Sequence, residues 1–142
     1  MKIALGSDEC TPLTDALQDR LGALGHEVVT VGALREGDDA SWPSVGTSVG
    51  RLVAQGECES GIVCCWSGTG VSIAANKVPG VRAALCDGAQ TASLARVWND
   101  ANVLALSLRT TSPDDIPQIL EEWFGAQPTD DPVYGPMIAK IL

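Results

Sequence analysis

Residues 61–77 constrain the fold of this 142-residue chain more than any other stretch. They begin with a short apolar run at 62–65, of the kind that forms a buried parallel strand, and continue into a glycine-containing loop at 66–70. A helix of small residues is expected over 72–77. In an open α/β sheet such a loop lies at the carboxyl end of a strand, where ligands bind and backbone N–H groups can face an anion.

Strands and helices are expected to alternate along the rest of the chain, because apolar runs alternate with segments of helical spacing that carry caps and terminal glycines. The predicted strands are residues 2–7, 27–31, 62–65, 81–86 and 103–107, and the predicted helices are 11–24, 43–55, 72–77, 88–98 and one capped by Ser112. Strict alternation with short connections favours a parallel sheet covered on both faces. We therefore predict an α/β fold, a Rossmann-like three-layer α/β/α sandwich with a five-stranded parallel sheet, as a single domain over residues 1–142.

Composition argues against several classes of protein. The net charge of −9 and pI of about 4.3 disfavour nonspecific nucleic-acid binding, and no basic run marks a membrane surface. No apolar run approaches the roughly 18 residues of a membrane span, and no signal pattern opens the chain, so a cytoplasmic protein is expected. The five cysteines are odd in number and lack metal-type spacing, which predicts reduced thiols and no metal site.

The segments 65–85 and 98–106 resemble the ribose-5-phosphate isomerase B and galactose-6-phosphate isomerase family. Residues 2–8, 25–28 and 42–43 fall in the same register, so the resemblance covers nearly the whole chain. It implies an aldose–ketose isomerase that moves a proton between C1 and C2 of an open-chain sugar through a cis-enediolate, with no metal or organic cofactor. It also implies a homodimer, in some cases a tetramer, with active sites shared across the interface. The short apolar tail within residues 126–142 is expected to pack there.

Four residues are candidates for the chemistry. The resemblance makes Cys65 the base; the residues alone leave open a reactive thiol beside a helix N-terminus or an inert cysteine of a buried strand. Ser67 would orient that thiol or move protons. Asp8 would bind sugar hydroxyls, although a role as helix cap stays open. Glu9 stands where the family usually has histidine, as a second acid–base group or a hydroxyl ligand.

The other candidates would bind substrate: Trp42, Trp66, Gly68, Thr69, Gly70, Trp98, Asn99 and Arg109. Backbone donors of the glycine loop would stabilise the enediolate oxygen, as Asn99 of the partner subunit would. Trp42 and Trp66 would form aromatic walls, with local packing an equal alternative for Trp66. Trp98 replaces a second family histidine, and Arg109 matches a phosphate partner. His26 is the only histidine, and we expect it to be structural.

The phosphate site is expected to be altered. The tail carries no arginine where the family usually has arginines, and Glu9 would repel a phosphate. The substrate would then be a free sugar or polyol-like ketone, or a sugar whose phosphate binds elsewhere. Two alternatives stay open: an epimerase or related carbonyl rearrangement in a specialised pathway, and a noncatalytic sugar-binding homologue.

Overall fold

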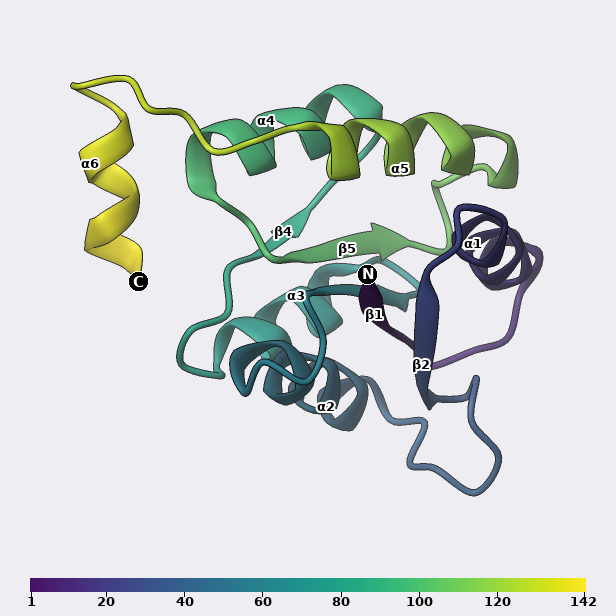
Figure 1. The fold of residues 1–142 in the computed structure, drawn as a ribbon. Coiled ribbons are helices and arrows are strands. Elements are labelled where there is room, and N and C mark those ends of the chain that lie inside the picture. The colour runs from purple at the N-terminus through teal and green to yellow at the C-terminus, as the bar shows by residue number, and fades with distance from the viewer.

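The computed structural model describes residues 1–142 and contains a five-stranded sheet in the order β2-β1-β3-β5-β4 (Figure 1). The strands are β1 (Lys2–Ser7), β2 (Glu27–Gly32), β3 (Ser60–Cys65), β4 (Ala83–Leu85) and β5 (Val103–Ser107). Every strand pair is parallel. The predicted α/β/α sandwich with a five-stranded parallel sheet is confirmed.

Because all the strands are parallel, their carboxyl ends meet at one edge of the sheet. Helices cover both faces of the sheet. The helices are α1 (Pro12–Ala23), α2 (Trp42–Ala54), α3 (Thr69–Asn76), α4 (Ala89–Asn99), α5 (Ile116–Gly125) and α6 (Gly135–Ile138). In Figure 1, α1, α4 and α5 lie on one face and α2 and α3 on the other, while α6 projects beside the end of α4. No helix combines the length and the apolar character that crossing a membrane requires.

Two apolar clusters fill the spaces between the layers. One joins the sheet to α1, α4 and α5 and includes Leu17, Leu104 and Trp123; the other joins it to α2 and α3. The adjacent Cys64 and Cys65 belong to different clusters, because successive side chains of a strand point to opposite faces. The two neighbouring thiols therefore lie on opposite faces of the sheet.

Two element boundaries differ from the prediction. Helix α3 begins at Thr69 and not at residue 72, because Gly68 adopts φ +75° and completes the turn in one residue. Strand β4 pairs only over Ala83–Leu85 and not over 81–86, because the N–H of Arg82 donates to the Asn102 side chain at 2.8 Å. The segment after Ser112 also opens with a 3-10 turn, Pro113–Asp115, before α5.

Candidate active site

The connection from β3 to α3 is a tight turn held by backbone hydrogen bonds. The Cys65 carbonyl accepts from the N–H groups of Gly68 at 3.2 Å and Leu108 at 2.9 Å. The hydroxyls of Ser67 and Thr69 lie 2.7 Å apart and share a hydrogen bond. No side chain caps the N-terminus of α3, so its first N–H groups remain available to an anion.

Cys65 is the last residue of β3 and lies opposite Ser107 of β5. It is a free thiol, only 5% exposed, and packs in the cluster under α2 and α3. The sulfur is therefore shielded from bulk water and immediately precedes the glycine turn. Its neighbour Cys64 is fully buried on the other face, where burial raises the pKa of the thiol.

Asp8 follows β1 at the same edge of the sheet. Ser7 pairs with Cys64, and the N–H of Asp8 donates to the Cys64 carbonyl at 3.3 Å, so Asp8 lies alongside the end of β3. Its Oδ1 is buried and has no hydrogen-bond partner. Burial, followed by the charge of Glu9, raises the pKa of the Asp8 carboxyl group. A buried acceptor without a partner is costly, and an incoming hydroxyl would satisfy it.

The alternative role of Asp8 as a helix cap is excluded, because Thr11 caps α1. The Thr11 hydroxyl accepts from the Thr14 N–H at 3.4 Å, and the Thr14 hydroxyl accepts from the Thr11 N–H at 2.9 Å. Glu9, which follows Asp8, is exposed. Its carbonyl accepts a hydrogen bond from the Ser7 hydroxyl, and its N–H donates to the same hydroxyl. The Glu9 carboxylate makes no hydrogen bond or ion pair and faces solvent beside Asp8.

Aromatic side chains flank the glycine turn. The Trp42 indole, at the start of α2, packs on Gly70 so closely that a Cβ there would lie 2.8 Å from its ring. Trp66 is 60% exposed, whereas its carbonyl is fixed by the Ser107 hydroxyl at 2.8 Å and the Arg109 N–H at 3.0 Å. Both indoles are partly open to solvent at this edge. The Arg109 guanidinium is exposed and unpaired.

Ser107 is a residue of this site that the sequence reasoning missed. Its hydroxyl donates to the Trp66 carbonyl and accepts from the Thr110 N–H at 3.2 Å, which ties the end of β5 to the turn after β3. Its position in the sequence could have indicated this role. Ser107 ends β5 as Ser7 ends β1, and polar residues at the carboxyl ends of parallel strands lie at one edge of the sheet.

Trp98 and Asn99 lie at the opposite edge of the sheet. Helix α4 starts after the carboxyl end of β4 and ends at Asn99, shortly before β5 begins. At 1.5 Å per residue a helix of this length spans about 16 Å. The single chain therefore does not bring these two residues to Cys65. His26, which packs on Phe124 with ring centroids 4.7 Å apart, also precedes a strand and lies away from the candidate site.

The largest groove on the molecule, about 620 Å³, is at this far edge. It is lined by Trp98, Asn99, Tyr134, Met137, Ile138 and Ile141, and therefore joins the end of α4 to the tail. No cavity of the single chain is lined by Cys65 or Asp8. A smaller polar cavity of about 330 Å³ beside Ser67 and Ser107 is the one that reaches the glycine turn. The candidate site is thus an open edge of the chain.

The carboxyl edge of the parallel sheet combines a buried thiol, a carboxylate oxygen without a hydrogen-bond partner and a glycine turn. These groups define an α/β protein equipped for acid–base chemistry. The sequence pattern of the Ribose/Galactose Isomerase family matches residues 3–136. Ribose-5-phosphate isomerase B from Escherichia coli (strain K12) is 37% identical over 127 residues, which cover 89% of this chain and 85% of that protein. The chain therefore belongs to this family of aldose–ketose isomerases, which confirms the resemblance of residues 65–85 and 98–106.

Two further similarities agree with this assignment. D-erythrulose-4-phosphate isomerase from Pectobacterium atrosepticum is 32% identical, with 89% of this chain and 84% of that protein covered. The solved structure of ribose-5-phosphate isomerase B from Clostridium thermocellum matches with a TM-score of 0.88 at 38% identity, covering 99% of this chain and 95% of that chain. The fold is thus shared with the Clostridium thermocellum enzyme over 99% of this chain.

Proposed function

We propose that this protein interconverts a small aldose and its ketose by proton transfer between C1 and C2, with Cys65 as the base. The observation that carries the proposal is the meeting of Cys65 and Asp8 at one sheet edge, where the Asp8 Oδ1 is buried without a partner. An isomerase of this kind needs one base beside a carbonyl and donors for the developing oxyanion. Both are present around the β3–α3 turn.

The steps follow from this arrangement. The Cys65 sulfur, as thiolate, takes the proton from C2 of the aldose, and the electron pair moves through C1 to O1, giving a cis-enediolate. The N–H groups of Thr69 and Gly70 at the start of α3 stabilise the negative oxygen, since the Gly68 N–H already donates to the Cys65 carbonyl. The Ser67 hydroxyl, already hydrogen-bonded to Thr69, passes a proton from O2 to O1. Cys65 then returns its proton to C1, and the ketose is complete. Asp8 accepts a hydrogen bond from a sugar hydroxyl throughout.

We further propose that the phosphate contacts of this protein differ from those of its relatives, since the three reported above are all named for phosphorylated sugars. Support comes from charge: the unpaired Glu9 carboxylate lies beside Asp8, and the tail contributes Lys140 as its one cation. Arg109 is the exposed cation next to the Trp66 turn. A free sugar, or a phosphate held through Arg109 away from Glu9, fits this distribution of charge.

We also propose a cytoplasmic homodimer in which the second copy completes the site, with the tail of residues 126–142 packed at the interface. The position of Asn99 and Trp98 at the edge opposite Cys65 supports this assembly, because those residues can reach a thiol only in another chain. The openness of the Cys65 edge supports it as well, since proton transfer next to a carbonyl benefits from exclusion of water.

The test is proton exchange at C2, followed by NMR in deuterated water, for matched phosphorylated and free pentoses and tetroses. We expect exchange with aldose–ketose conversion in the wild type and its loss in Cys65→Ala. Cys64→Ala is the matched control, because it removes the neighbouring buried thiol from the other face of β3. Exchange without ketose formation would favour an epimerase, and equal activity of the two variants would remove Cys65 as the base.

A further inference from the structure

Asp100 has an unusual backbone conformation immediately after Asn99. It is the one residue other than glycine with positive φ, at φ 46° and ψ 44°, and it ends α4. The left-handed region disfavours residues with a Cβ by about 1–2 kcal/mol, although aspartate tolerates it better than most. Surrounding contacts must therefore hold Asp100 in this turn.

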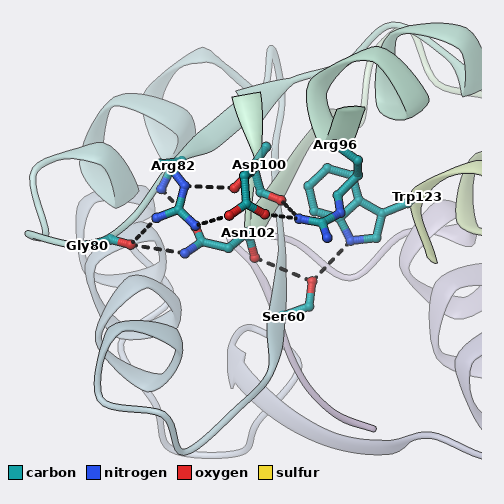
Figure 2. A network of polar contacts seen from close by, with 8 residues as sticks. Ser60, Gly80, Arg82, Arg96, Asp100, Asn102 and Trp123 are labelled. Atoms are coloured by element: carbon teal, nitrogen blue, oxygen red, sulfur yellow. Dashed lines mark hydrogen bonds and ion pairs between the residues drawn. The ribbon is translucent and has the colours of Figure 1, made fainter. Parts of the chain in front are cut away.

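Two arginines clamp the Asp100 carboxylate from opposite sides (Figure 2). Arg96 Nη1 lies 3.0 Å from Oδ1, and Arg82 Nη2 lies 3.3 Å from Oδ2. Arg82 Nε also donates to the Asp100 carbonyl at 2.7 Å, and Arg96 Nη1 donates to the Ala101 carbonyl at 2.6 Å. The two arginine side chains are only 15% and 19% exposed, so these charge-assisted bonds are partly protected from water.

The clamp is itself anchored to the core (Figure 2). The Arg96 guanidinium lies 5.6 Å from the ring of buried Trp123, whose Nε1 donates to the Ser60 hydroxyl at 3.1 Å. On the other side, Arg82 Nη1 and Asn102 Nδ2 both donate to the Gly80 carbonyl at 3.0 Å. A helix C-terminus needs only partners for its last carbonyls. This turn has a network that joins α4, β3, α5 and the segment before β4.

Asn99 is the last residue of α4 and directly precedes Asp100 in this turn. It is exposed and lines two adjoining grooves, one with Trp98 and Tyr134 and one with Arg82. Resting on the shared site proposed above, we propose that Asp100 is a positioning residue: its clamp fixes the α4–β5 turn so that Asn99 enters the active site of the second copy. Asp100 touches neither substrate nor Cys65 and acts through Asn99 alone.

The first test is a double-mutant cycle on the full-length dimer. Asp100→Gly accepts the left-handed backbone and removes the carboxylate, so we expect it to fold and dimerise while kcat/KM falls at least about tenfold, as small misplacements of a binding group do. Asn99→Ala should lose as much, and the double variant should be no worse than Asn99→Ala. Glu121→Gln, which removes an unpaired exposed carboxylate of α5, should match the wild type. Independent, multiplying losses, or an Asp100→Gly enzyme as active as the wild type, would overturn the proposal.

Mixed dimers distinguish positioning across the interface from a merely structural role of Asp100. A dimer of one Cys65→Ala subunit and one Asp100→Gly subunit, isolated with two affinity tags, contains one site with an intact Cys65 facing an intact Asn99 turn. We expect about half the wild-type kcat, with both parent homodimers nearly inactive. A mixed dimer no more active than its parents would overturn positioning across the interface. If the wild type exchanges no sugar proton, the proposed function fails together with this inference; an active wild type with no complementation removes the inference alone.

Discussion

The indole of Trp42 lies against the Cα of Gly70. A Cβ on Gly70 would sit 2.8 Å from Cε3 and 2.9 Å from Cδ2 of the ring, well inside ordinary van der Waals contact. The first residue of α2 is thereby fitted to the first turn of α3. This contact places the Trp42 indole beside the glycine turn that follows Cys65.

Gly70→Ala should therefore impair activity without unfolding the protein. The added methyl group must displace the indole or the start of α3, and a shift of the turn donors lowers kcat/KM by roughly 10–100-fold. The measurement is steady-state isomerisation, with circular dichroism as the check on folding. Gly22→Ala is the control, because a Cβ in that exposed part of α1 meets nothing within 4 Å. Equal kinetics for the two variants would show that the contact has no catalytic importance.

Gly68→Ala should act on stability. Gly68 has φ +75°, and a Cβ there would lie 2.6 Å from Leu85 Cδ1 and 2.9 Å from the backbone carbon of Leu106. Gly37 has a similar φ of +79° with nothing within 4 Å, so Gly37→Ala reports the backbone strain alone. We expect urea denaturation to show Gly68→Ala less stable than Gly37→Ala by about 1–3 kcal/mol, the usual range for overpacking. Matching midpoints would mean that β4 and β5 yield to the methyl group.

Much of this architecture follows from local pattern. Apolar runs and terminal glycines locate each strand in the sequence. Because parallel strands end at one edge, the sequence alone predicts that Asp8 and Cys65 lie close together. Alternation along β3 likewise separates Cys64 from Cys65. These features depend on the order of residues within single elements.

The remaining features depend on contacts between segments distant in sequence. The early start of α3 depends on the positive φ of Gly68, at a place where a Cβ would collide with Leu85 of β4 and Leu106 of β5. The short β4 depends on the Asn102 side chain, which accepts the hydrogen bond of the Arg82 N–H. The unfilled oxygen of Asp8 is a property of packing, since a carboxylate after a strand is equally compatible with a helix cap. The clamp on Asp100 joins four separate elements, and no local spacing indicates it.

Asp8→Asn should make the protein more stable and less active. The pKa of Asp8 is raised above 3.8 in the folded state, first by burial and then by Glu9, so the folded state binds more protons than the unfolded state. The free energy of unfolding of the wild type therefore falls as pH rises from 3.8 to the pKa of Asp8 in the folded state. Above that folded-state pKa, the full destabilisation by the buried carboxylate is present. Urea midpoints should favour Asp8→Asn at pH 7, and the difference should disappear below pH 3.8.

The same variant should lose activity, because an amide replaces the carboxylate that accepts the sugar hydroxyl. A hydrogen bond of about 1–3 kcal/mol corresponds to a loss in kcat/KM of roughly 5- to 150-fold. Asp15→Asn, an exposed carboxylate in the first turn of α1, serves as the control for both measurements. An Asp8→Asn protein less stable than the wild type at pH 7 would contradict the proposal that burial of the Asp8 carboxylate destabilises the fold.

Thiol labelling should distinguish a catalytic cysteine from an inert one. Burial raises the pKa of the Cys86 thiol to about 12 and also raises the pKa of the Cys58 and Cys64 thiols, so these three react slowly near neutral pH. Cys10 is exposed and would react first, so the experiment uses Cys10→Ser. Mass spectrometry after iodoacetamide treatment should show Cys65 modified ahead of the rest, with protection by a sugar substrate. Uniformly slow modification would favour the sugar-binding alternative.

The tail offers the most direct test of the proposed dimer. Tyr134, Met137 and Ile141 are each about half exposed in the single chain, at 53%, 51% and 56%, although all three line the apolar groove beside Trp98. Tyr134 packs edge-on against Trp98 with centroids 5.7 Å apart, and the Thr129 N–H donates to the Val97 carbonyl at 2.8 Å, so the groove is anchored to α4. An apolar surface held in this way is suited to a second copy of the chain.

Met137→Glu should therefore weaken the dimer, because a buried unpaired carboxylate is strongly unfavourable at an interface. Analytical ultracentrifugation should shift from a dimer toward the 14.7 kDa protomer, and isomerase activity should fall with it as Asn99 leaves the other site. Ala23→Glu adds the same charge at an exposed position of α1, outside the tail, and should leave the dimer intact. A monomeric wild type with full activity would instead place every catalytic contact within one chain.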